Sequence, residues 1–211
     1  MTNAQPHSSG EPATVDVAGS PDESVKEKQL LQVLTKAANT LNEAGVRFAV
    51  GGGCAVYARG GPASDHDVDL FVRPRDVDAA REALVAAGMR PVDPPENWLS
   101  KVYEGEHLVD LIFRPNDRDV DDSMLARAQW MRIGPTAAPV ISGTDLMSDK
   151  LNVLDAHRCD FAPLLRIARA LREQVDWGQV ATATAASPYA RAFLGLLADL
   201  GIIEPGSEVR R

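Results

Sequence analysis

The stretch GGGCAVYARGGPASDHDVDLFV, residues 51–72, constrains the fold most, because it sets two aspartates inside a segment that otherwise predicts a buried strand. Side chains alternate along a strand, so Asp67 and Asp69 point to one face while the intervening Val and Leu side chains pack on the other. A carboxylate in such a strand costs several kcal/mol unless a partner neutralises its charge. The stretch therefore indicates a functional site.

The paired carboxylates suit a hard cation such as Mg²⁺ or Mn²⁺. Two carboxylates that point the same way from one strand can together hold an ion that prefers carboxylate and phosphate oxygens. A third candidate ligand is Asp110, which interrupts the apolar strand pattern HLVDLIF at residues 107–113. We expect Asp67, Asp69 and Asp110 to form one catalytic and metal-binding group.

The glycines that precede the aspartates predict an anion site. A strand ending in VGGG before a short helix brings the backbone N–H groups of Gly52 and Gly53 close to an anion, and glycine permits this approach because it has no Cβ. The pattern is not a Walker loop, since no Gly-Lys-Ser/Thr follows. It is not a dinucleotide fingerprint either, since G-x-G-x-x-G is absent.

Residues 46–113 resemble the DNA polymerase β-like nucleotidyltransferase superfamily, in which "GG" after a strand, a short helix, "D-hydrophobic-D-L" and a later in-strand Asp follow one another. The most similar branch is the bacterial AbiEii/MenT-type nucleotidyltransferase toxins, whose GG-x-A matches Gly52, Gly53 and Ala55. The antibiotic nucleotidyltransferases are similar as well, because a His precedes their paired aspartates as His66 does here.

Residues 145–174 resemble the downstream part of the toxin-type proteins, where a Lys is followed by an Arg and an Asp at positions matching Lys150, Arg158 and Asp160. The resemblance implies nucleotide binding by Lys150 and Asp160. It also points to Arg59, as the replacement for an Arg or Thr that the family often carries shortly before its first Asp. From the residues alone, Lys150 can also be a solvated helix residue, and Asp160 can be the N-cap of the next helix.

A basic stripe follows in the same segment. Arg166, Arg169 and Arg172 recur every three residues on a predicted helix, with Arg158 near its start. Such a stripe is typical of a merely solvated face. If the acceptor is RNA, these four arginines are the candidate contacts to backbone phosphates.

The pattern of elements predicts an α/β (α+β) fold. Helix–strand alternation followed by helices alone favours an α/β half and a helical C-terminal domain. The resemblance implies that the first half has a nucleotidyltransferase-fold mixed sheet with flanking helices. Ser, Pro, Gly and Thr dominate residues 1–19, which we expect to be a disordered tail. The predicted boundaries are 20–142 for the catalytic domain and 143–211 for the helical domain.

Charge and composition leave the acceptor open. The net charge is −8, and half of it comes from the first 24 residues, which hold four acidic residues and no Lys or Arg, so the remainder can still present a local basic patch. No apolar run approaches the length of a membrane span, and no signal peptide is recognisable. Two cysteines without metal spacing suit the reducing cytoplasm, where we expect the protein to act.

The resemblance implies a metal-dependent enzyme that moves an NMP from an NTP to an acceptor hydroxyl and releases pyrophosphate. The toxin branch implies a tRNA 3′ end or other RNA as acceptor, together with a cognate antitoxin. The antibiotic branch implies a small aminoglycoside- or lincosamide-like acceptor. A third alternative is an inactive nucleotide- or protein-binding module on the same fold. The residues do not say which of ATP, CTP, GTP and UTP is used.

Overall fold

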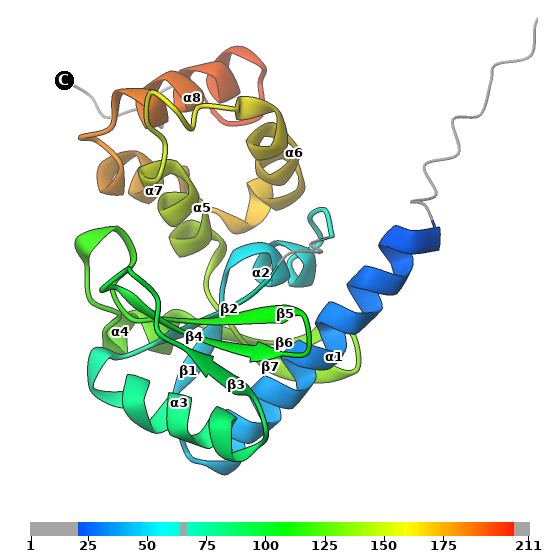
Figure 1. Cartoon of the computed structure of the whole chain (residues 1–211). Helices are drawn as coiled ribbons and strands as arrows, with labels where there is room; N and C mark the ends of the chain where they lie inside the picture. Colours follow the sequence, from blue (N-terminus) through cyan, green and yellow to red (C-terminus); the bar gives the residue numbers. More distant parts are fainter. Residues whose placement is uncertain (1–20, 64–66, 205–211) are drawn as a thin grey trace, which may run out of the picture.

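The computed structural model describes residues 21–63 and 67–204. The predicted tail, residues 1–19, and His66 lie outside these residues. Within them, seven strands form one mixed sheet in the order β3-β4-β5-β2-β1-β7-β6 (Figure 1). The strands are β1 (Phe48–Val50), β2 (Asp67–Val72), β3 (Arg90–Val92), β4 (Leu99–Glu104), β5 (His107–Ile112), β6 (Gln129–Ile133) and β7 (Thr136–Val140).

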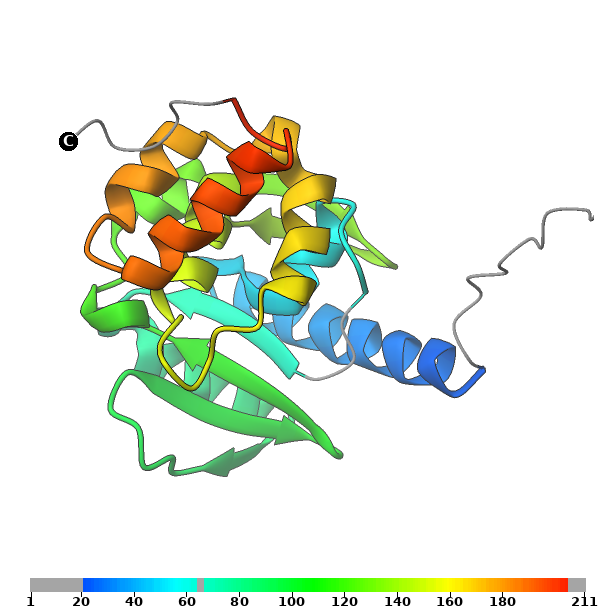
Figure 2. The same ribbon diagram turned by 90° about the horizontal axis from the view of Figure 1, so that it is seen from above.

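Helices cover both faces of this sheet. The helices are α1 (Pro21–Glu43), α2 (Gly52–Ala58), α3 (Val77–Ala86), α4 (Asp122–Arg127), α5 (Gly143–Asn152), α6 (Phe161–Leu171), α7 (Trp177–Ala183) and α8 (Pro188–Asp199), with short 3₁₀ turns at Pro74–Asp76, Pro115–Asp117 and Arg172–Gln174. Figure 1 shows α1 and α3 below the sheet, and α2 with α5–α8 above it. In the view from above in Figure 2, α6–α8 lie over the β6–β7 side of the sheet and leave β4 and β5 uncovered.

The centre of the sheet is buried because β2 and β5 carry apolar side chains on the face toward α1 and α3. Val68, Leu70, Val109 and Leu111 are all fully buried there. Strand β2 pairs antiparallel with β1 and parallel with β5, and the β5 register sets Asp69 directly opposite Asp110. Partners in a parallel register share a face, so both carboxylates lie on the face toward α2 and α5.

The sequence pattern predicted the central elements correctly and missed three short ones. The strand DVDLFV, the strand that contains Asp110 and the helical C-terminal half are all present. Asp160 is the N-cap of α6, where its carboxylate accepts a hydrogen bond from the backbone N–H of Ala162 at 3.0 Å. The elements β3, α4 and α7 were not predicted.

The boundary between the sheet half and the helical half stays a prediction. Helix α5 follows β7 after two residues, and a single cluster of buried apolar side chains includes Val140 of β7 and Phe193 of α8. No helix in the described part of the chain combines the length and the apolar character needed to cross a bilayer.

Candidate active site

Three carboxylates meet on the sheet face under the helical half. Asp67 and Asp69 alternate with buried residues of β2, and the β2–β5 register brings Asp110 beside them. One carboxylate oxygen from each of the three lies within 4.8 Å of the others. The structure thus brings together the three aspartates that the sequence pattern singled out.

The electrostatics of this cluster favour a bound cation. Burial, together with the neighbouring carboxylates of Asp67 and Asp110, raises the pKa of Asp69 to about 7. Burial also raises the pKa of Asp110 to about 6, and its buried Oδ1 atom has no hydrogen-bond partner among the described residues. A divalent cation would neutralise the repulsion among the carboxylates and would coordinate the oxygen that has no hydrogen-bond partner. These residues therefore fit Mg²⁺ or Mn²⁺.

A tight glycine turn packs against the same carboxylates. Gly52, at the start of α2, has φ +52°, and a Cβ added there would lie 1.6 Å from Oδ2 of Asp69. A Cβ on Gly51 would lie 2.3 Å from the Phe71 ring, and the Gly51 N–H donates to the Asp69 carbonyl at 2.9 Å. The first two glycines are therefore required because side chains of β2 fill the space that any Cβ would occupy.

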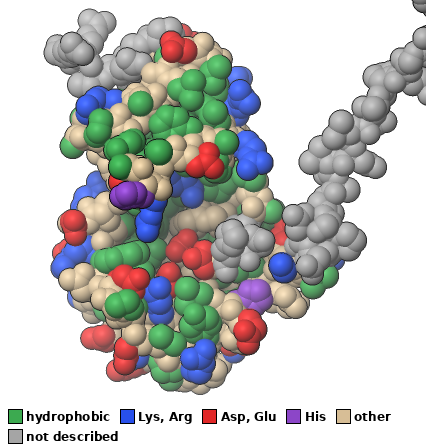
Figure 3. Space-filling view, turned by 45° about the horizontal axis from the view of Figure 1, so that its top comes forward, with side chains coloured by type: hydrophobic (Ala, Val, Ile, Leu, Met, Phe, Trp, Pro, Cys, Tyr) green, Lys and Arg blue, Asp and Glu red, His purple; other side chains and the backbone are tan. Residues whose placement is uncertain are grey.

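Helix α5 brings a cation to this turn. Lys150 is partly buried, which lowers its pKa, while the carboxylates of Asp69 and Asp67 act in the opposite direction. A cavity of about 410 Å³ is lined by Gly52, Asp69 and Lys150 together. Figure 3 shows the hollow between the sheet half and the helical half, with acidic side chains gathered on its floor. One cavity thus contains carboxylate, glycine and lysine groups suited to a metal-bound phosphate.

Comparison with known proteins gives the family. The model of the family described as nucleotidyl transferase of unknown function (DUF2204) matches residues 30–186, most of the chain. The chain belongs to this family. It is a nucleotidyltransferase, and the superfamily resemblance is confirmed, while the closer likeness to AbiEii/MenT-type toxins stays a prediction. No curated protein matches the sequence significantly.

Solved structures share the fold of this nucleotidyltransferase. ANT(2″)-Ia in complex with adenylyl-2″-tobramycin superposes with a TM-score of 0.57 at 15% identity, and the match covers 75% of this chain and 96% of that chain. An antigenic nucleotidyltransferase-like protein from Paracoccidioides brasiliensis gives 0.51 at 17% identity, covering 86% and 89%. At such identities the likeness shows the fold alone, and it confirms the predicted α/β nucleotidyltransferase fold.

Two residues expected to bind the nucleotide lie elsewhere in this nucleotidyltransferase. Arg59 is buried at the end of α2, where its guanidinium donates to the carbonyls of Val140 and Ile141 and to two glutamine side chains. It joins α2 to β7 and does not line the cavity, so the expectation that it contacts phosphate is corrected. Asp160 caps α6 and does not line the cavity either.

The four arginines separate into two groups. Arg158 lines the cavity from the connection between α5 and α6. Arg166 and Arg169 lie exposed on α6 and Arg172 on the 3₁₀ turn after it, and none of the three lines the cavity. Arg172 pairs with Glu173 at 2.8 Å. Any role of this stripe therefore concerns a ligand that extends beyond this cavity.

Several lining residues were not found from the sequence. Trp98, Asn116 and Asp149 line the site, yet each looks ordinary in its local pattern. Asn116 and Asp117 have φ angles of 51° and 57°, an uncommon conformation for residues other than glycine. Only the tertiary structure, which folds the segment after β5 over the cavity, identifies them.

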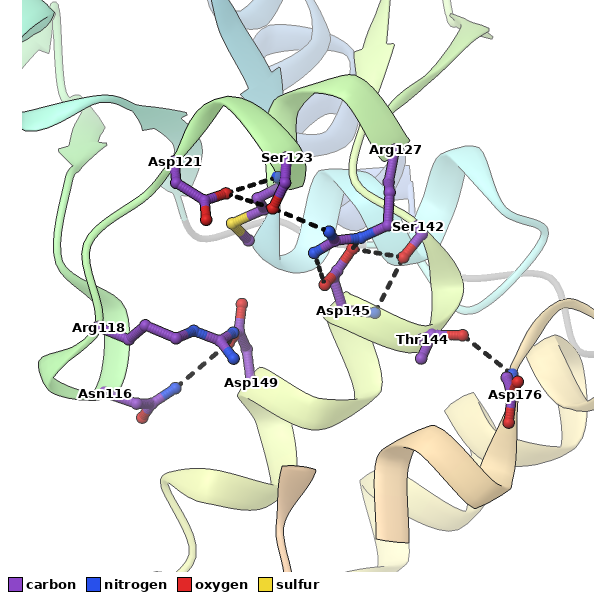
Figure 4. A network of polar contacts seen from close by, with 11 residues as sticks. Asn116, Arg118, Asp121, Ser123, Arg127, Ser142, Thr144, Asp145, Asp149 and Asp176 are labelled. Atoms are coloured by element: carbon purple, nitrogen blue, oxygen red, sulfur yellow. Dashed lines mark hydrogen bonds and ion pairs between the residues drawn. The ribbon is translucent and has the colours of Figure 1, made fainter. Parts of the chain in front are cut away.

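Polar contacts fix α5, the helix that carries Lys150 (Figure 4). Ser142 caps its first turn, and Asp145 accepts two hydrogen bonds from the Arg127 guanidinium, at 2.7 and 3.0 Å. Further along the helix, Asp149 accepts a hydrogen bond from Asn116 at 3.4 Å. These contacts tie α5 to α4 and to the segment after β5, and so hold Lys150 over the sheet.

Proposed function

We propose that this nucleotidyltransferase moves an NMP from an NTP to an acceptor hydroxyl at the cluster of Asp67, Asp69 and Asp110. The convergence of three carboxylate oxygens within 4.8 Å, beside the turn at Gly52, is the observation that carries this proposal. In this proposal Asp67 and Asp69 hold the metal, which would neutralise phosphate charge and polarise the reacting phosphoryl group.

The remaining residues act on the two reactants. The backbone of Gly52 and Gly53 and the Lys150 ammonium bind the β- and γ-phosphates, since the lysine supplies a compact positive charge at the same cavity. The acceptor oxygen attacks the α-phosphorus, the bond to the pyrophosphate oxygen breaks, and Asp110 takes the hydroxyl proton. The proximity of an Asp110 carboxylate oxygen to those of Asp67 and Asp69, within 4.8 Å, supports this role.

We further propose that the acceptor is a tRNA 3′ end and that the protein is the toxin of a toxin–antitoxin pair. The exposed arginines on α6, outside the cavity, support an acceptor that is larger than the nucleotide site and carries phosphates. A small antibiotic is the second candidate, because ANT(2″)-Ia, which shares the fold, has a structure with adenylyl-2″-tobramycin.

The test is transfer from each of the four labelled NTPs to total tRNA and, separately, to a panel of aminoglycosides and lincosamides. With Mg²⁺, the wild-type protein should transfer the labelled NMP to one of the two acceptor classes. The substitutions Asp67→Asn and Asp69→Asn should each abolish this transfer. The matched control is Asp199→Asn, an exposed aspartate on α8, which should retain full activity. Full activity in both site variants would refute the assignment of the metal site.

The same variants give a readout that needs no acceptor. Removing one of three crowded carboxylates relieves repulsion, so both variants should be at least as stable as the wild type without metal. Addition of Mn²⁺ should raise the melting temperature of the wild type and of Asp199→Asn, and raise it much less in the two site variants. Equal metal-induced shifts in all four proteins would place the metal elsewhere.

A further inference from the structure

The cavity extends past the metal-binding carboxylates in one direction only. Asp69 lines it, whereas Asp67 and Asp110 do not. Beyond Asp69 the lining continues with Phe71 of β2 and Ile112 of β5, which are paired in register. Each lies two residues further along its strand than the carboxylate before it, a distance of about 7 Å at the usual rise per residue.

Trp98 stands at the far end of this path. Its carbonyl accepts hydrogen bonds from the backbone N–H groups of Phe113 and Arg114, both at 3.1 Å, which places it just after the end of β5. Phe113 follows Asp110 by three residues, so the path from carboxylate to tryptophan is about 10 Å along the strand. The floor between them is apolar, which suits a sugar and a base better than further phosphates.

The indole of Trp98 is available to a ligand. The residue is 38% exposed, while most large apolar residues of the sheet are buried, and it lines the cavity from the sheet half. Val153 and Arg158 line the same cavity from the helical half, so an aromatic ring and a guanidinium occupy opposite halves of one site. Aromatic side chains and arginine guanidinium planes are the groups on which nucleobases stack.

We infer that Trp98 is the stacking platform for the base of the donor nucleotide. The inference rests on the proposed function, because that function places the triphosphate at Gly52, Asp69 and Lys150 and so leaves the other end of the cavity to the base. The acceptor then approaches from the side of Asp67 and Asp110, because these two residues do not line the cavity. Every base has a π-face, so this stacking adds affinity for all four NTPs.

The chain holds three tryptophans, which allows a fluorescence test. Trp130 is 67% exposed on the edge strand β6 and does not line the cavity, and Trp177 is buried on α7 with its Nε1–H bonded to the Arg172 carbonyl. The variant Trp130→Phe therefore leaves Trp98 as the accessible emitter. Each NTP should quench its emission, and the quenching should be absent in Trp98→Phe.

Binding of tripolyphosphate, which has no base, distinguishes contacts to the base from contacts to the phosphates. Trp98→Ala should weaken NTP binding roughly 5- to 150-fold, the range expected for the loss of one stacked base. It should leave tripolyphosphate binding unchanged, because that probe reaches only the glycine and lysine end. Trp98→Phe should recover most of the NTP affinity, and Trp130→Ala, the matched control, should bind NTP and tripolyphosphate like the wild type.

The outcomes distinguish this inference from the proposal on which it rests. If Trp98→Ala binds NTP as tightly as the wild type, or if the acceptor rather than the NTP quenches Trp98, the stacking assignment is overturned while nucleotidyl transfer stands. If the wild type binds neither NTP nor tripolyphosphate, the proposed function itself fails and the inference fails with it. Melting temperatures of all variants show whether a loss of binding reflects a loss of folding.

Discussion

The carboxylate of Asp149 occupies an unfavourable position next to Lys150 in α5. Burial raises its pKa to about 6, although Arg118, 3.9 Å away, acts in the opposite direction. Its Oδ2 atom has no hydrogen-bond partner within the described part of the chain. Asn116 supplies one hydrogen bond, to Oδ1. In the sequence, an aspartate followed by a lysine in a predicted helix is typical of a solvent-exposed charge. The sequence therefore does not predict that Asp149 is buried under the segment after β5.

Asp149→Asn should therefore stabilise the protein at high pH. Below about pH 4 the carboxyl group is protonated in the folded and unfolded states, so it contributes nothing to pH-dependent stability. Between about pH 4 and pH 6 the unfolded state loses its proton first, and above about pH 6 the full penalty of a buried charge remains. The penalty is on the order of 1–3 kcal/mol. Because asparagine carries no charge, the variant avoids it.

Thermal unfolding of the two proteins from pH 4 to pH 8 measures this difference. Each kcal/mol corresponds to about 2–4 °C for a domain of this size, so the variant should melt several degrees higher at pH 8 and nearly equal the wild type at pH 4. Asp199→Asn, exposed on α8, is the matched control and should show no such trend. A variant less stable than the wild type at pH 8 would mean that Asp149 is ionised and well paired.

At the scale of elements, the glycine turn between β1 and α2 depends on the side chains of β2. Gly52→Ala combines φ +52° with a Cβ that would overlap Oδ2 of Asp69. Gly60 provides a control, since it has φ +88° but nothing lies within 4 Å of its added Cβ. Gly60→Ala should cost about 1–2 kcal/mol from backbone strain alone. Gly52→Ala should cost more and should also displace the Asp69 carboxylate.

Two measurements separate these effects. Urea unfolding gives the stability loss of each variant, and the Mn²⁺-induced shift in melting temperature reports the state of the carboxylate cluster. We expect Gly60→Ala to keep the metal-induced shift and Gly52→Ala to lose it. Equal stability losses together with an intact shift in both variants would show that the turn does not constrain the metal site.

Elements differed in how far the sequence predicted them. Strand β2 was predicted because its alternation of aspartates with Val and Leu matches one buried face and one functional face. Strand β3 was not predicted from the sequence because it contains only three residues at the edge of the sheet and none of them is buried. The helix α7 contains only seven residues and begins Trp-Gly, which carries little helical signal. Short elements of this kind form because neighbouring elements fix them.

At the scale of the whole molecule, the sequence predicted the mixed sheet and the aspartate cluster but not the cavity beside that cluster. The cluster depends on one strand register, which local alternation and one further in-strand aspartate suffice to indicate. The cavity forms only where several elements come together, and no local sequence pattern predicts this arrangement. Its lining residues come from β2, β5, α5, the segment after β5 and the loop before β4. The same reason explains why Arg59, close to the glycines in sequence, turned out to be a buried link to β7.

The proposed acceptor is likewise tested at the scale of the whole molecule, because the proposal places RNA contacts on a surface outside the cavity. If the acceptor is RNA, exposed arginines on α6 should contact its phosphates, and binding should weaken steeply with salt. Arg166→Ala with Arg169→Ala should bind tRNA more weakly and lower the log–log salt slope by about 1.4 to 1.8. NTP affinity should stay unchanged, because neither arginine lines the cavity.

A control with the same change in charge distinguishes a specific surface from net charge. Arg81→Ala with Arg132→Ala removes two arginines from α3 and β6 of the sheet half and should leave the tRNA salt slope as in the wild type. A small antibiotic acceptor has no track of phosphates, so both double variants would then turn it over at the wild-type rate. If the salt dependence of tRNA binding has the same slope in both double variants and in the wild type, the α6 arginines do not belong to the acceptor site. Labelling of an antibiotic but never of tRNA, with any of the four NTPs, would assign the protein to the small-molecule class.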